Sequence, residues 1–134
     1  MCLPGQLELK IQKIAEKCGC GAELWPDRDK YDVKITLPDG QVWAIDAKTH
    51  RNPYMLKKSI EKDCVFTHTK AQKVFYVVPD DCLTDYPDYC KICNDALASN
   101  YPDSIAKCVS MRNFSKELKG EVEDVKLRNY QKKS

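Results

Sequence analysis

The chain has 134 residues, of which 43% are hydrophobic, and a formal net charge of +2. This length and hydrophobic content predict one domain with one core, spanning residues 1–134, and the net charge is too small to indicate nucleic-acid binding by itself. The sequence contains no apolar run long enough for a membrane span and no signal peptide, so we expect a cytoplasmic protein that does not enter a membrane. The opening MCLPGQ leads almost at once into a helix, and we expect a domain excised from a longer protein.

The first predicted element is a helix over Gln6–Cys18. Its apolar residues recur at helical spacing and predict one buried stripe, formed by Leu7, Ile11, Ile14 and Cys18. At about 100° per residue, Glu8 lies at the edge of this stripe, whereas Glu16 points nearly opposite. Gly21–Trp25 is predicted to be a short strand that follows the helix.

The segment Tyr31–His50 predicts a β-hairpin, because apolar and polar residues alternate in both of its arms. If Pro38-Asp39-Gly40 is a three-residue loop with Gly40 in the left-handed conformation, Leu37 pairs with Gln41, and Asp32 then lies opposite Asp46. Lys48 shares the face of Asp46, since side chains two residues apart on a strand point the same way. A two-residue Asp39-Gly40 turn would shift the register by one residue and separate the two aspartates.

The remaining elements follow from periodicity and helix signals. We expect a helix over Pro53–Asp63, a buried strand over Lys73–Pro79, and two further helices near Tyr89–Ser99 and Phe114–Gln131. The predicted order over residues 6–80 is α-β-β-β-α-β, and a helical C-terminal extension occupies residues 81–134.

Asp32, followed on the next strand by Asp46-Ala47-Lys48, resembles the active-site signature of the PD-(D/E)XK nuclease superfamily, the restriction-endonuclease-like fold. The resemblance covers roughly residues 6–80 and implies an α/β (α+β) fold, in which helices flank a mixed central sheet. It also implies a further acid from the first helix, for which Glu8 is the better placed candidate. The spacing from Glu8 to Asp32 to Asp46 is similar to that of archaeal Holliday-junction resolvases.

These residues predict a Mg²⁺- or Mn²⁺-dependent nuclease that hydrolyses DNA, in restriction and defence or in DNA repair. Asp32 and Asp46 would hold the metal, since Mg²⁺ prefers oxygen ligands, and the Ala47 carbonyl would complete the protein ligands. Lys48 would orient or activate the attacking water, and Glu8 would assist. The alternatives are a non-catalytic module of the same fold that binds nucleic acid or protein, and an effector that cleaves RNA. Asp27 and Asp29 are rival ligands, although turn residues after Pro26 are the simpler interpretation.

Basic residues cluster in sequence around the predicted site and are expected to contact phosphates. They are Lys57, Lys58, Lys62, Lys70 and Lys73. The alternative is that they form ordinary solvated faces of a helix and a strand. His50 lies two residues beyond Lys48 and would contact the scissile phosphate or simply end the strand, whereas His68 is predicted to be a loop residue. A homodimer, a fusion or a partner subunit is expected from the resemblance.

The chain contains eight cysteines, which is unusual for its length. Without a signal peptide, reduced thiols or a metal site are favoured over disulfides. Two close pairs would together form a four-thiolate Zn²⁺ site: Cys18 with Cys20, and Cys90 with Cys93. The alternative is a set of separate free cysteines, because cysteine packs readily as a small apolar side chain.

Overall fold

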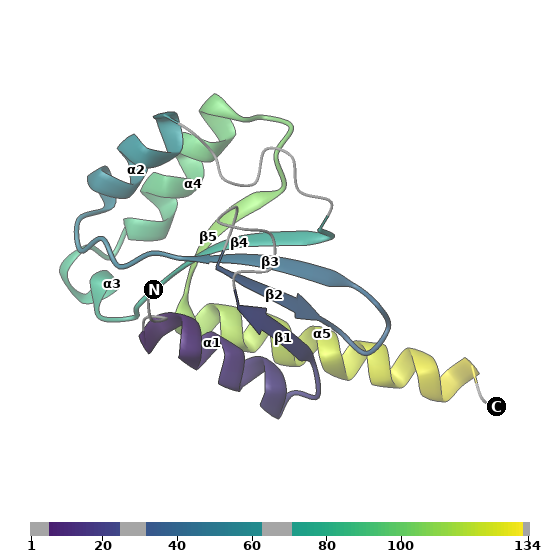
Figure 1. Ribbon diagram of the computed structural model, residues 1–134. Helices are drawn as coiled ribbons and strands as arrows, with labels where there is room; N and C mark the ends of the chain where they lie inside the picture. Colours follow the sequence, from purple (N-terminus) through teal and green to yellow (C-terminus); the bar gives the residue numbers. More distant parts are fainter. Residues whose placement is uncertain (1–5, 25–31, 63–70, 133–134) are drawn as a thin grey trace.

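The computed structural model describes residues 6–24, 32–62 and 71–132 (Figure 1). Its helices and strands follow the order α1 (Gln6–Lys17), β1 (Gly21–Leu24), β2 (Val33–Thr36), β3 (Val42–Ala47), α2 (Pro53–Lys62), β4 (Lys73–Val78), α3 (Cys82–Asp85), α4 (Tyr89–Asn100), β5 (Ala106–Ser110) and α5 (Met111–Lys132). No helix among the described residues is long and apolar enough to cross a membrane.

The strands form one mixed sheet in the spatial order β1-β2-β3-β4-β5. The first three strands are antiparallel neighbours, whereas β3, β4 and β5 run parallel to one another. Helix α2 therefore connects two parallel strands, and α4 lies in the connection to the third, as parallel crossovers require. The predicted mixed central sheet flanked by helices is confirmed.

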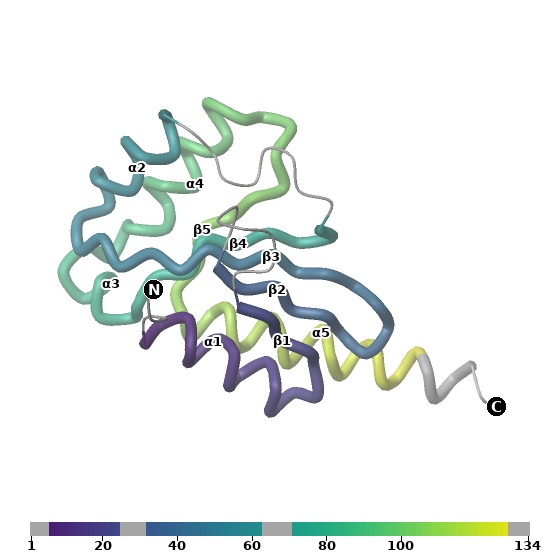
Figure 2. The backbone as a smooth tube through the Cα atoms, viewed as in Figure 1, coloured from purple at the N-terminus to yellow at the C-terminus, as the bar shows by residue number. Residues whose placement is uncertain are grey.

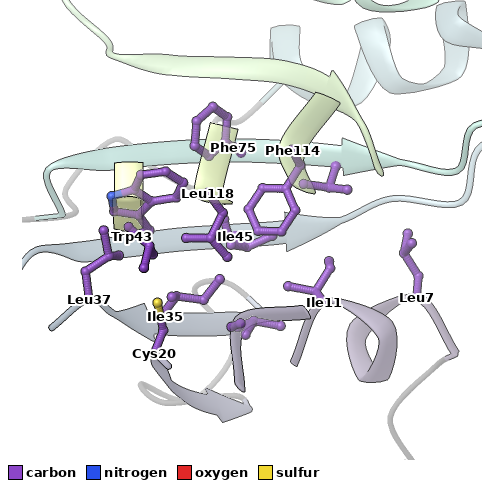
Figure 3. Packing of buried hydrophobic residues seen from close by; sticks show 14 of the residues in the cluster. Leu7, Ile11, Cys20, Ile35, Leu37, Trp43, Ile45, Phe75, Phe114 and Leu118 are labelled. Atoms are coloured by element: carbon purple, nitrogen blue, oxygen red, sulfur yellow. The ribbon is translucent and has the colours of Figure 1, made fainter. Parts of the chain in front are cut away.

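Helices cover both faces of the sheet, with α2 and α4 on one face and α1 and α5 on the other (Figures 1 and 2). Alternate residues of the central strands face opposite cores. Ala44 and Tyr76 belong to the core beneath α2 and α4, while Ile45 and Phe75 belong to the core beneath α1 and α5. The second core includes Trp43, which is fully buried and has its ring 5.5 Å from that of Phe75 and 6.5 Å from that of Phe114, centre to centre (Figure 3).

The hairpin between β2 and β3 has the predicted register. Leu37 N–H donates to the Gln41 carbonyl at 2.9 Å, and Gly40 has a φ of 95°, which only glycine adopts without strain. The ladder pairs Thr36 with Val42 and continues to Val33 opposite Ile45. The three-residue loop is therefore the one the protein uses, and the ladder ends with Val33 opposite Ile45, the residues directly next to Asp32 and Asp46.

The C-terminal third differs from the expectation of helices alone. It contains the predicted α4 and α5, but also the short helix α3 and the strand β5, which pairs with β4 over its whole length. The sequence of β5 is AKCVS, too short and too poor in β-branched residues to stand out by alternation. Its state is decided by pairing with β4, which a local pattern does not encode.

Candidate active site

Asp32 and Asp46 meet where β2 begins and β3 ends. The ladder is distorted at Asp32, whose N–H donates to the Ile45 carbonyl at 3.0 Å. Its carboxylate accepts a hydrogen bond from the N–H of Ala47 at 2.8 Å and so replaces a main-chain acceptor of β2. This contact fixes the Asp32 side chain against the end of β3, beside Asp46.

Asp46 is a buried acid with an incomplete set of partners. Its exposure is 4%, and its neighbour on β4 is the buried Tyr76. The Lys48 ammonium lies 3.0 Å from Oδ2 of Asp46, but this oxygen has no partner in hydrogen-bonding geometry among the described residues. A buried polar atom without a hydrogen bond costs free energy, so the position favours an additional positive group.

The two carboxyl groups perturb each other. Burial, together with a hydrogen bond to Asp46 and the charge of Asp46, raises the pKa of Asp32 to about 7, against the opposing effects of the Ala47 N–H and the Lys48 ammonium. Two carboxylates that share one site resist simultaneous ionisation unless a cation lies between them. The metal-free site is therefore short of positive charge.

The Ala47 carbonyl is a third oxygen at the same place. In a strand, the N–H and C=O of one residue point to the same side, and the Ala47 N–H points to Asp32. The next residue, Lys48, instead donates its N–H to the Val77 carbonyl of β4 at 2.9 Å. Two carboxylates and one carbonyl, one of the carboxylates being the buried Asp46, fit a hard divalent cation such as Mg²⁺. No group of three or more His, Cys, Asp or Glu side chains that could hold a metal occurs among the described residues.

Helix α4 supports the segment between Lys48 and the start of α2 through two hydrogen bonds. The hydroxyl of Tyr89, which is fully buried, donates to the His50 carbonyl, and the thiol of Cys93 donates to the Pro53 carbonyl at 3.7 Å. The side chain of His50 itself is exposed. Tyr89 is 39 residues from His50 in sequence, so no local signal could have identified this support.

Glu8 lines a hollow whose lining does not include the two aspartates. This hollow, of about 560 Å³, lies on the α1 side of the sheet and is also lined by Ala47, Thr49 and Asp80. Asp32, Asp46 and Lys48 do not line this hollow, since the side chains of Asp46 and Lys48 point to the other face. Glu8 and Ala47, one of the predicted metal-binding residues, thus line the same hollow.

The predicted phosphate contacts divide into two groups. Lys58 and Lys62 are exposed on α2 and Lys57 is half-buried there; this helix begins six residues after β3. Lys73 is at the other end of the strands, where its ammonium lies 5.0 Å from the centre of the Trp43 ring in a cation–π contact. Lys73 therefore stabilises the core beneath α1 and α5 and does not belong to the site.

The predicted four-thiolate zinc site is wrong. Cys18 and Cys20 pack with the core beneath α1 and α5, whereas Cys90 and Cys93 pack with the core beneath α2 and α4. The sheet separates the two pairs, so they cannot share one ion. The cysteines among the described residues are free thiols.

Several residues weighed from the sequence lie outside the described residues. They are the rival ligands Asp27 and Asp29, the predicted loop residue His68 and the predicted phosphate contact Lys70.

Comparison with known proteins agrees with this geometry. No curated protein and no solved structure shows significant similarity to the chain. Residues 5–126 match a protein family described as "REase associating with pPIWI_RE", in which REase denotes a restriction endonuclease. The match covers most of the chain and includes the β2–β3 hairpin with its two aspartates and Lys48. The chain belongs to this family of restriction-endonuclease-like domains, and its function is nuclease-like.

Proposed function

We propose that this protein is a Mg²⁺- or Mn²⁺-dependent endonuclease that hydrolyses phosphodiester bonds of DNA. The observation that carries the proposal is the pair Asp32 and Asp46, held together at the end of β3 with a raised Asp32 pKa and with the buried Asp46 carboxylate paired with the Lys48 ammonium at 3.0 Å. A pair of acids that destabilises the metal-free protein is expected where a cation is to be bound.

Each residue of the site has a distinct part in the proposed reaction. Asp32, Asp46 and the Ala47 carbonyl would hold the divalent ion, which supplies Lewis-acid stabilisation of the phosphate and a more acidic water. Lys48 is anchored by Asp46 at 3.0 Å and keeps a quarter of its side chain exposed, so its ammonium can face both the attacking water and the phosphate. Glu8 would assist from the other side of Ala47.

The substrate would approach along the exposed face of α2. Lys58 and Lys62 lie one turn apart on this face, and Tyr54 in its first turn is also exposed. Ammonium groups on a helix that starts just beyond the site would bind backbone phosphates on either side of the scissile bond. Lys57 and His50 would add further contacts.

The family description supports the proposal that this chain acts together with a second protein. Its members are named as associating with pPIWI_RE, and we propose that this chain acts on DNA together with a pPIWI_RE protein, in defence against foreign DNA. The nuclease site would then be supplied by this chain, and the choice of target by the partner.

The test is cleavage of supercoiled plasmid, linear duplex, single-stranded DNA and RNA in Mg²⁺ or Mn²⁺, with the protein alone and with its pPIWI_RE partner. Asp46→Ala and Lys48→Ala should each abolish DNA cleavage while the circular dichroism spectrum is retained. Lys107→Ala is the matched control, because Lys107 is an exposed lysine on the distant strand β5.

Three outcomes would contradict the proposal. Full DNA cleavage by the Asp46→Ala protein would refute the assigned site. Cleavage of RNA alone would refute the DNA assignment. Tight, metal-independent DNA binding without cleavage in any combination would indicate a non-catalytic module of the same fold.

A further inference from the structure

Helix α4 has two adjacent stripes of side chains that make different contacts. Tyr89 and Cys93, four residues apart, hold the connection between β3 and α2 through the His50 and Pro53 carbonyls. The neighbouring stripe, Cys90 and Asn94, faces β5 and contacts Cys108. The contacts with β5 and with the segment that follows Lys48 are therefore made by neighbouring residues of one short helix.

The contact between α4 and β5 brings two thiols together. The Asn94 side chain accepts a hydrogen bond from the Cys108 N–H at 2.7 Å and donates one to the Cys108 carbonyl at 3.1 Å. These two bonds fix the position of Cys108 along α4. One turn earlier on the helix, Sγ of Cys90 lies 3.8 Å from Sγ of Cys108. Cys108 is buried, whereas Cys90 is partly exposed.

We propose that Cys90 and Cys108 form an intrachain disulfide when the protein meets hydrogen peroxide, and that this bond lowers the nuclease activity reversibly. A disulfide needs an S–S distance of about 2.0 Å, so the two sulfur atoms must approach by a little under 2 Å in all. Rotation of two side chains with a small movement of the first turn of α4 can supply this displacement.

The chemistry assigns a separate role to each cysteine. The Cys108 thiol donates a hydrogen bond to the Cys90 sulfur, and this bond lowers the pKa of Cys90 although partial burial opposes it. The same hydrogen bond, one with Cys93 and burial raise the pKa of Cys108. The partly exposed Cys90 is thus the thiolate that reacts first, and the buried Cys108 is the resolving thiol.

The oxidation takes place in two steps. The Cys90 thiolate attacks one oxygen of hydrogen peroxide, breaks the O–O bond and becomes a sulfenic acid, while the released hydroxide takes a proton to give water. The Cys108 sulfur, having lost its proton, then attacks the sulfenic sulfur and displaces the hydroxyl group, which leaves as a second water. Two thiols lose two electrons in total, and one peroxide accepts them.

Tyr89 connects this reaction to the site. It directly precedes Cys90, and its hydroxyl is a hydrogen-bond donor to His50, two residues after Lys48. Pulling the start of α4 toward β5 strains this bond and releases the segment that carries Lys48. A displacement of about 1 Å of a group near the reacting atoms is enough for a large loss of rate. The effect on cleavage rests on the proposed function, whereas disulfide formation does not.

Trypsin separates the relevant cysteines, so the bond can be mapped directly. Cleavage after Lys73, Lys91, Lys107 and Arg112 yields peptides 74–91, 92–107 and 108–112, which contain Cys82 with Cys90, Cys93, and Cys108 respectively. The reduced protein is treated with peroxide, alkylated, digested without reductant and analysed by mass spectrometry. We expect peptide 108–112 to be linked to 74–91, and the link to disappear on addition of dithiothreitol.

Two serine variants identify the partner. Cys90→Ser should abolish the link, whereas the matched control Cys82→Ser, in the same peptide, should retain it. A link between 108–112 and 92–107, a link that persists in Cys90→Ser, or a Cys108 that remains fully alkylated would overturn the proposal.

Two measurements test whether the disulfide between Cys90 and Cys108 affects the candidate active site. Cleavage of duplex DNA should fall about tenfold or more on oxidation of the wild type and recover with dithiothreitol, while Cys90→Ser should keep its rate. Amide hydrogen exchange of residues 48–54 should become faster on oxidation, and this measurement needs no substrate. A mapped disulfide with unchanged exchange in that segment would refute the coupling. A mapped disulfide with faster exchange, in a protein that cleaves nothing even when reduced, would refute the proposed function instead.

Discussion

Asp32→Asn should stabilise the metal-free protein at alkaline pH. The Asp32 pKa is raised from 3.8 to about 7 by burial and by Asp46, so the folded protein binds a proton there more tightly than the unfolded chain does. Between about pH 4 and pH 7 the folded state therefore holds more protons, and stability is lost as pH rises through this window. Above about pH 7 both states are ionised at Asp32 and the penalty is constant.

The expected gain in the free energy of unfolding follows from the shift in the Asp32 pKa. About three pKa units correspond to about 4 kcal/mol at 1.36 kcal/mol per unit, and partial solvent exposure of Asp32 reduces this to about 2 kcal/mol. Asparagine carries no charge, keeps an oxygen to accept the Ala47 N–H, and can donate to Asp46. We expect the variant to be about 2 kcal/mol more stable than wild type at pH 8, or about 8 °C in melting temperature for a domain of this size.

The assay is urea and thermal unfolding of both proteins in EDTA from pH 4 to pH 9. The stability difference should be largest above pH 7 and shrink steadily toward pH 4. Millimolar Mn²⁺ should then raise the melting temperature of the wild type more than that of Asp32→Asn, because binding to the folded state adds stability. Asp95→Asn on the exposed side of α4 is the control and should show neither effect. A variant no more stable than wild type at pH 8, or a difference independent of pH, would refute the crowding of the two acids.

Two further predictions concern the surroundings of the site. Lys58→Ala and Lys62→Ala should each weaken DNA binding in EDTA, as measured by fluorescence anisotropy. Each should also reduce the magnitude of the slope of log K against log salt by about one, because one phosphate contact is lost. Lys13→Ala, on the exposed face of α1, is the control and should leave the slope unchanged. An unchanged slope in both α2 variants would remove this helix from the DNA path. Tyr89→Phe should cost about 1–2 kcal/mol in urea unfolding and slow cleavage, because the His50 carbonyl loses its tyrosine donor; unchanged stability and rate would show that this hydrogen bond supports neither.

The hairpin shows how far a short sequence can specify geometry. The alternation of β2 and β3, with Gly40 able to adopt a φ of 95°, was enough to predict the three-residue loop and the register of the ladder as far as Val33 and Ile45, the neighbours of Asp32 and Asp46. The loop and the register are both local features, because the turn conformation decides which residues of the two strands pair with each other. The helices α1, α2, α4 and α5 were predictable for a similar reason, because the apolar period of a helix is contained within its own residues.

Only the tertiary structure decided which face of the sheet each buried side chain reaches. The spacing of Cys18 with Cys20 and of Cys90 with Cys93 suggested one zinc site, but spacing does not show that the two pairs lie on opposite faces of the sheet, and the predicted site failed for that reason. The strand β5, the support of His50 by Tyr89 and the approach of Cys90 to Cys108 all depend on packing between segments distant along the chain or separated by a crossover. The sequence by itself determined most of the local elements and the register of the β2–β3 hairpin, because turn geometry and side-chain alternation act between neighbours. The partners of α4 and the face reached by each buried side chain were decided by close packing of the whole chain, because apolar burial is non-directional and specifies no partner.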